Sequence, residues 1–166
     1  MMIIREVITK DAEKLAILMQ QVDHNSQYML WEAGERNIPT ENQIKMIEGI
    51  KNKDNSTILV AEAEKELIGY MFILGGGARR QRHTAYIVVG ILEEHRGKGI
   101  GTRLFSEMNE WASDNNIHRL ELTVVIDNKA GVALYKKMGF EIEGIKKDSL
   151  LINDRFYDEY YMVKIL

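Results

Sequence analysis

Hydrophobic residues follow two periods along this chain, and these periods divide it into expected strands and helices. Apolar residues that alternate with polar ones, or that form short unbroken runs, predict strands. These strands cover residues 3–8, 57–63, 67–74, 84–92, 119–126, 140–145 and 157–165. Apolar residues three or four positions apart predict helices over about residues 11–22, 41–51, 99–115 and 128–138. Residues 23–38 show neither period and are expected to be irregular.

Residues at the ends of these elements refine the picture. Asp11 is expected to be the N-cap of the first helix, because a short oxygen-bearing side chain can accept a free helical N–H. Gly139 is expected to stop the last helix in a left-handed conformation. The strands over residues 84–92 and 119–126 each lead into a helix, so a right-handed crossover is expected to make them a parallel pair.

The composition indicates one folded domain over residues 1–166. Apolar residues make up 45% of the chain and proline occurs once, which argues against disorder. A net charge of −3 gives no nucleic-acid footprint. The absence of cysteine excludes disulfides and thiolate ligands, and the four histidines lack a paired spacing, so no metal is expected. No signal peptide or membrane-length apolar run is visible, so we expect a cytoplasmic protein that does not bind membranes.

A glycine-rich turn follows the strand over residues 84–92. It has the sequence Arg96-Gly97-Lys98-Gly99-Ile100-Gly101-Thr102 and leads directly into a helix. Backbone N–H groups at a helix N-terminus are unpaired and carry partial positive charge, which suits a phosphate or pyrophosphate. Glycine permits close approach and positive φ angles there. The turn is therefore a candidate phosphate-binding loop, and a glycine-rich turn without a ligand is the alternative.

Two well-known phosphate motifs fit this loop poorly. A P-loop requires serine or threonine directly after its lysine, whereas Gly99 follows Lys98. A dinucleotide fingerprint requires a third glycine where this chain has Leu104, and its acidic residue belongs at the end of the next strand. Glu121 lies near the start of that strand instead.

A third pattern fits the loop, and a second segment supports it. Arg96, Gly99 and Gly101 match Arg/Gln-x-x-Gly-x-Gly/Ala, which resembles the acetyl-coenzyme A loop of the GCN5-related N-acetyltransferases (GNAT). Residues 128–140 resemble a second element of that superfamily. The matching positions are Asn128, Leu134, Tyr135, Lys137, Gly139 and Phe140, with Gly131 where alanine is usual. Two matches in the right order are far more specific than either alone.

The resemblance implies a fold and a set of cofactor contacts. The expected fold is a mixed, strongly twisted α/β sheet of about seven strands, flanked by four helices on both faces. Acetyl-CoA is the implied co-substrate. Its pantetheine arm would pair with the backbone of Val89, Gly90 and Ile91, and its pyrophosphate would meet the amides from Gly97 to Thr102. Arg96 or Lys98 would add charge. Asn128 would cap the last helix, bind the cofactor, or do both.

Tyr135 is the candidate catalytic residue that the resemblance implies. An amine that attacks a thioester expels a thiolate, and a phenol with a pKa near about 10 keeps a proton for that sulfur at neutral pH. No general base can be assigned, because the usual glutamate position on the strand before the loop has no clear acid. Glu93 and Glu94 lie in the turn, and Glu32 and Glu35 could reach the acceptor side, but each is more easily read as structural. Removal of the amine proton through ordered water is an equally open alternative.

The acceptor amine is the least determined part of the function. Residues 67–166 are similar to a bacterial branch that includes N-acetyltransferases of free L-amino acids, and the similarity fades over residues 1–66, where the acceptor pocket is usually shaped. Tyr28 and Trp31 favour a small apolar pocket there, with Glu35 as a further candidate contact.

The expected function is acetyl transfer from acetyl-CoA to a primary amine by direct attack in a ternary complex, most readily on a free amino acid. A protein N-terminus, as in ribosomal-protein acetylation, a polyamine and an antibiotic amine are alternatives. A non-catalytic acetyl-CoA-binding module is an alternative of another class. The apolar last strands also suggest a homodimer.

Overall fold

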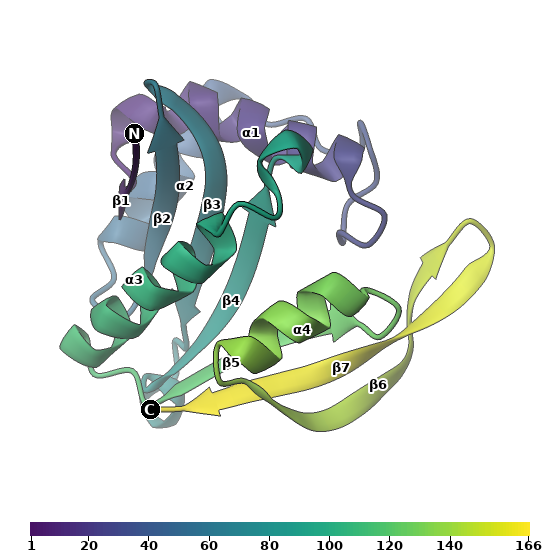
Figure 1. Ribbon diagram of the computed structural model, residues 1–166. Coiled ribbons are helices and arrows are strands. Elements are labelled where there is room, and N and C mark those ends of the chain that lie inside the picture. The colour runs from purple at the N-terminus through teal and green to yellow at the C-terminus, as the bar shows by residue number, and fades with distance from the viewer.

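The computed structural model describes all 166 residues and has a seven-stranded sheet with four α-helices (Figure 1). The strands are β1 (Met2–Glu6), β2 (Thr57–Ala63), β3 (Glu66–Gly75), β4 (Thr84–Ile91), β5 (Arg119–Val125), β6 (Glu141–Ile152) and β7 (Arg155–Ile165). The helices are α1 (Ala12–Asn25), α2 (Thr40–Lys51), α3 (Ile100–Asp114) and α4 (Lys129–Lys137). The expected mixed sheet, with its strand and helix order, is confirmed.

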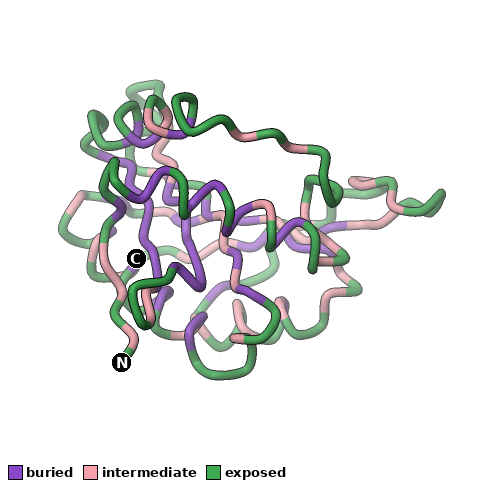
Figure 2. Tube along the Cα trace, turned by 90° about the horizontal axis from the view of Figure 1, so that it is seen from above, coloured by how far each residue is buried: buried purple, intermediate pink, exposed green.

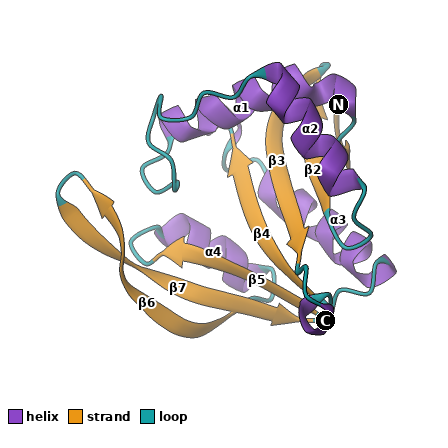
Figure 3. Ribbon diagram, turned by 180° about the vertical axis from the view of Figure 1, so that it is seen from behind, coloured by secondary structure: helices purple, strands orange, loops and turns teal.

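The sheet is divided between β4 and β5. Its strand order is β1-β2-β3-β4-β5-β7-β6, and all neighbours are antiparallel except β4 and β5. This pair is parallel, as expected from the two strand–helix units, but it is hydrogen-bonded only where Thr84–Tyr86 meets Arg119–Glu121. Beyond these residues the two strands diverge (Figure 3). The divergence separates the half formed by β1–β4 from the half formed by β5, β7 and β6.

Helices cover both faces of the sheet. α1 and α2 lie on one face of β2–β4, while α3 lies on the opposite face and α4 follows it beside β5 (Figures 1 and 3). Figure 2 shows that the buried residues concentrate between these layers. On α3 the buried side chains are Ile100, Leu104, Phe105, Met108 and Ala112, which recur at helical spacing. Burial of one such large apolar side chain stabilises the fold by roughly 1.5–3 kcal/mol. None of the helices is long and apolar enough to cross a membrane.

The last two strands are longer than the sequence predicted. β6 extends to Ile152 and β7 starts at Arg155, whereas the predicted strands ended at residue 145 and began at residue 157. Asn153 and Asp154 form the turn with φ angles of 50° and 62°. The added residues begin with the polar run Lys146-Lys147-Asp148-Ser149, which resembles a loop in sequence, but pairing of Leu150–Ile152 with Arg155–Tyr157 continues the two strands beyond it. The resulting hairpin extends away from the rest of the molecule (Figure 1).

Asp11 precedes α1 as predicted, but its side chain does not cap that helix. Its carboxylate accepts the N–H of Ile8 at 2.8 Å and two hydrogen bonds from Arg5 at 2.8 Å. The hydrogen bonds from Arg5 hold the pKa of Asp11 below its usual value despite its burial. Asp11 therefore ties β1 to the start of α1, which sequence spacing alone could not reveal.

Candidate active site

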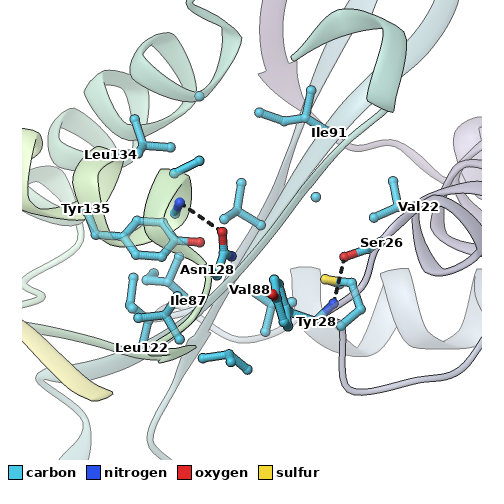
Figure 4. Close-up of a pocket in the computed structure, with 18 of the residues that line it drawn as sticks. Val22, Ser26, Tyr28, Ile87, Val88, Ile91, Leu122, Asn128, Leu134 and Tyr135 are labelled. Carbon is cyan, nitrogen blue, oxygen red and sulfur yellow. Dashed lines mark hydrogen bonds between the residues drawn. The ribbon is translucent and has the colours of Figure 1, made fainter. Parts of the chain in front are cut away.

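A large cleft occupies the place where β4 and β5 diverge. Its volume is about 1200 Å³. The walls come from β4, β5, the turn before α3, the start of α4, the segment after α1 and the β6–β7 hairpin. Figure 4 shows labelled side chains from α1 and the segment after it, from β4 and β5, and from α4 and its N-cap converging on one cavity. A gap between parallel strands exposes backbone and side chains from both faces of the sheet, so two reactants can approach each other through it.

The glycine-rich turn has the geometry of an anion-binding loop. Gly97 and Gly99 have φ angles of +72° and +82°, a left-handed conformation that other residues adopt at a cost. The first hydrogen bond of α3 runs from the N–H of Arg103 to the carbonyl of Gly99 at 3.1 Å. The preceding amides, from Ile100 to Thr102, thus have no acceptor within the helix and line the cleft. A pyrophosphate group fits this arrangement.

The two cations of the turn differ in their placement. The Nε of Arg96 donates to the carbonyl of Ile91 at 3.2 Å, which joins the turn to the end of β4. Arg96 also lines the cleft, whereas Lys98 is exposed and does not. The structure therefore brings Arg96, but not Lys98, to the site.

Val89, Gly90 and Ile91 present a free strand edge to the cleft. One edge of β4 pairs with β3, where Gly90 lies opposite Tyr70, and the other edge has no partner beyond Tyr86. The phenol ring of Tyr70 leans over Gly90, because an added Cβ there would lie 2.5 Å from the ring. An extended ligand arm can add to such an edge as a further strand would. The backbone donors and acceptors that a pantetheine arm requires are therefore available.

Tyr135 reaches from α4 into the cleft. Its ring packs against Phe105 and Phe140, with centroids 5.6 and 6.4 Å away, and its hydroxyl points into the cavity (Figure 4). Burial raises the pKa of Tyr135 to about 12, and the nearby Tyr86 adds to this shift. The phenol thus stays protonated throughout the physiological pH range and can donate a proton to a group in the cleft.

Asn128 caps α4 and also borders the cleft. Its Oδ1 accepts the N–H of Gly131 at 3.0 Å. A Cβ at Gly131 would lie 2.6 Å from the Asn128 side chain, so the glycine makes room for the cap. Because Asn128 also lines the cleft, its amide group can serve both as a cap and as a ligand contact.

The segment after α1 forms the opposite wall. Tyr28 and Trp31 line the cleft, and the ring of Tyr28 meets Tyr157 of β7 edge-on at 6.0 Å. Arg36 anchors the segment through two hydrogen bonds of 2.8 Å to the buried Asp23. Glu35 lies outside the cleft and accepts the N–H of Glu32 at 3.0 Å. The structure brings two of the three candidate acceptor contacts together and leaves Glu35 apart.

Several residues of the cleft carried no signal in the sequence. Tyr70 and Arg36 lie side by side on the acceptor side, where burial raises the pKa of Tyr70 to about 12 and the guanidinium opposes that rise. Ser149 and Glu159 enter from the β6–β7 hairpin, about which the sequence gave a wrong boundary. Only the pairing of β7 with β5 brings them to the site.

Comparisons with known proteins agree with this arrangement. The sequence profile of the Acetyltransferase (GNAT) family matches residues 22–140. The L-amino acid N-acetyltransferase AaaT of Escherichia coli (strain K12) is 35% identical over 109 residues, which cover 64% of this chain and 67% of AaaT. An acetyltransferase of the GNAT family from Streptococcus pneumoniae matches the structure with a TM-score of 0.96 at 29% identity, covering 100% of both chains. Ribosomal-protein-alanine N-acetyltransferase from Brucella melitensis matches with a TM-score of 0.86 at 28% identity, covering 99% of both chains.

The family profile spans the segment after α1, the glycine-rich turn and the whole of α4. The free amides at the start of α3 and the open edge of β4 fit the phosphates and the arm of acetyl-CoA. The chain therefore belongs to the GNAT family and is an acetyl-CoA-dependent N-acetyltransferase.

Proposed function

We propose that this enzyme acetylates a small primary amine, with a free amino acid as the leading acceptor. The observation that carries the proposal is the two-sided cleft. Tyr135 and the free edge of β4 lie on the coenzyme side, while the segment after α1 closes the other side by reaching Tyr157 of the hairpin. A closed acceptor side favours a small molecule over a long peptide.

The proposed reaction is a direct transfer in a ternary complex. The backbone of Val89–Ile91 and the amides from Gly97 to Thr102 hold acetyl-CoA, and Asn128 borders its arm. The amine nitrogen forms a bond to the thioester carbonyl carbon, and the carbon–sulfur bond breaks. Tyr135 gives its phenol proton to the departing sulfur. A free backbone amide near Ile91 stabilises negative charge on the carbonyl oxygen during the step.

The charges on the acceptor side favour an amino acid over a polyamine. Lys146 lines this side outside any ion pair, and a carboxylate can approach it, whereas the guanidinium of Arg36 is already paired with Asp23. The relative AaaT, whose printed name specifies L-amino acids, supports the same acceptor. The structurally similar enzyme from Brucella melitensis is named ribosomal-protein-alanine N-acetyltransferase, so a protein N-terminus is the second candidate acceptor. We place the reaction in a bacterial cytoplasm as part of this proposal, because these relatives are bacterial proteins.

Thiol release from acetyl-CoA across a panel of amines tests the proposal. The panel contains free L-amino acids, polyamines, aminoglycosides and peptides with free N-termini, and Tyr135→Phe is the control variant. We expect turnover with free amino acids and its loss in the variant. Turnover only with peptides would replace the small acceptor by a protein N-terminus. Tight acetyl-CoA binding without turnover on any amine would favour a binding module instead.

A further inference from the structure

Two carboxylates line the cleft, and they differ in their surroundings. Glu93 is exposed in the turn before α3, on the coenzyme side. Glu159 of β7 has only 8% of its surface exposed. Its Oε1 accepts a hydrogen bond from the Ser149 hydroxyl at 2.5 Å. No lysine, arginine or histidine lies within ion-pair distance of Glu159, although the structure contains eight ion pairs elsewhere.

The strand pattern shows which side of the sheet Glu159 faces. Tyr160 and Met162 pack into the core with the side chains of α4. Successive side chains on a strand point to opposite faces, so Tyr157 and Glu159 face away from α4. The contact between Tyr157 and Tyr28 shows that this face meets the segment after α1. Glu159 therefore belongs to the acceptor side of the cleft, opposite Tyr135.

The pairing of three strands brings Glu159 to the gap. Val125, the last residue of β5, lies directly opposite it and also lines the cleft. On the other edge of β7, Glu159 is paired with Lys146 of β6, and the register of this pairing shifts between Lys146 and Leu150. This shift places the Ser149 hydroxyl on the carboxylate. The irregular pairing thus orients one oxygen of Glu159.

We propose that Glu159 binds the ammonium group of the acceptor and removes its proton before attack. A buried carboxylate without a cation is costly, and one hydroxyl donor offsets only part of that cost. An ammonium ligand would complete the site. The inference deepens the proposed function and rests on it, because it requires a primary amine as the acceptor. It supplies the base that the strand before the glycine-rich turn lacks.

The proton transfers balance with two groups of this chain. The ammonium gives one proton to the Glu159 carboxylate, and the free amine then forms the carbon–nitrogen bond. The carbon–sulfur bond breaks, and the sulfur takes the phenol proton of Tyr135. The second proton lost by the nitrogen restores the phenol, and Glu159 returns its proton to water. The products are the N-acetyl compound, the free thiol and one proton.

Other ionisable groups line the same site, and their ionisation can also affect the pH dependence of the rate. Tyr28 faces it from the segment after α1, Tyr86 from β4, Tyr135 from α4 and Lys146 from β6. None of these is a carboxylate, so a pH profile that changes when Glu159 is replaced identifies this residue. The hydroxyl of Tyr86 shares a hydrogen bond of 2.8 Å with Thr123 across the start of the gap.

Glu159→Gln is the decisive variant, because glutamine keeps the shape and can still accept the Ser149 hydroxyl. We expect kcat/KM for a free amino acid to fall at least about 100-fold at neutral pH. The wild-type profile should be flat below the pKa of the amine, whereas the variant should gain activity steadily up to that pKa. The loss therefore shrinks at high pH. The affinity for acetyl-CoA and the melting temperature should stay unchanged.

Two control variants separate the possible results. Glu93→Gln removes the other carboxylate of the cleft and should keep the wild-type pH profile. Ser149→Ala keeps the charge and should cost less than Glu159→Gln. If the wild type acetylates amines and Glu159→Gln matches it, or loses the same factor at every pH, the role of Glu159 is overturned while the proposed function stands. If the wild type acetylates no amine, the proposed function fails and this inference fails with it.

Discussion

The coenzyme side and the acceptor side of the cleft are built in different ways. The coenzyme side consists of a compact turn, one strand edge and the start of two helices, over residues 89–102 and 128–135. The acceptor side combines segments far apart in the chain, namely residues 25–36 and the hairpin residues 146–159. Local backbone geometry thus forms the proposed coenzyme side, and long-range packing forms the proposed acceptor side. Substitutions on the two sides should therefore affect different kinetic constants.

The largest effect of a single substitution on the coenzyme side is expected at Tyr135. Tyr135→Phe keeps the ring between Phe105 and Phe140 but removes the proton donor, so kcat should fall about 100- to 1,000-fold. Steady-state kinetics and calorimetry measure kcat and acetyl-CoA affinity separately. An affinity that falls as much as kcat would mean that Tyr135 binds the cofactor rather than donating a proton.

The pH dependence of kcat tests the same phenol. A neutral donor is active below its pKa and is lost as pH rises through that pKa, which burial raises to about 12. We expect no alkaline loss of kcat near pH 10, where an ordinary tyrosine would ionise. A loss of activity centred at about pH 10 that is absent from Tyr135→Phe would contradict a donor that stays protonated.

On the acceptor side, Tyr28→Ala should weaken acceptor binding. The substitution removes the contact with Tyr157 that closes this wall, so KM for the amine should rise about tenfold. The KM for acetyl-CoA should not change. Steady-state kinetics in which each substrate is varied in turn measures the two KM values separately. An equal rise in both constants would show that the two sides of the cleft are not independent.

Gly99→Ala should have the complementary effect on the coenzyme side. The left-handed conformation of Gly99 costs another residue about 1–2 kcal/mol, and the turn would shift its amides to relieve that strain. Affinity for acetyl-CoA should fall about fivefold to tenfold, while the amine KM is unchanged. Titration calorimetry measures the affinity of the variant and of the wild type for acetyl-CoA. Unchanged affinity would argue against an anion-binding role for the turn.

A smaller effect, mainly on stability, is expected when the α4 cap is removed. Asn128→Ala loses the hydrogen bond to Gly131, which should cost about 1 kcal/mol and lower Tm by roughly 2–4 °C. Thermal unfolding followed by circular dichroism tests this value. A large loss of acetyl-CoA affinity at unchanged Tm would assign Asn128 to the cofactor instead of the helix.

The expected homodimer would form through the β6–β7 hairpin on the acceptor side. Disrupting this dimer should affect activity less than the substitutions above. β6 is an edge strand with exposed Ile145 and Leu151, a surface that a second copy can cover through a two-fold contact. Light scattering should give the mass of two chains, and Ile145→Glu should give the mass of one. A wild-type protein with the mass of one chain would refute the dimer.

Much of the fold followed from short patterns in the sequence. Alternation of apolar residues predicted the central strands, and the stop at Gly139, with φ at +92°, was confirmed. The hairpin was predicted too short because the polar run Lys146–Ser149 interrupts the apolar pattern, whereas cross-strand pairing of Leu150–Ile152 continues the strands beyond that run. Asp11 was correctly placed before α1, but its role depends on Arg5, a contact that helix signals do not encode.

The candidate site divides in the same way. The coenzyme side was predicted from contiguous residues, since glycine geometry and free helical amides are local properties of a turn. Lys98 and Glu35 were predicted beside the site but lie outside the cleft, because their side chains point to solvent or to their own segment. Side-chain direction in a loop depends on what packs around it, which a linear motif does not specify.

The sequence by itself determined the family, the reaction class and the local shape of the coenzyme loop. Only the tertiary structure decided which face of β7 meets the segment after α1, and so placed Glu159 opposite Tyr135. Strand periodicity gives alternating faces but does not say which face lies over a gap between two other strands. That choice depends on the order and register of the whole sheet, which long-range pairing fixes.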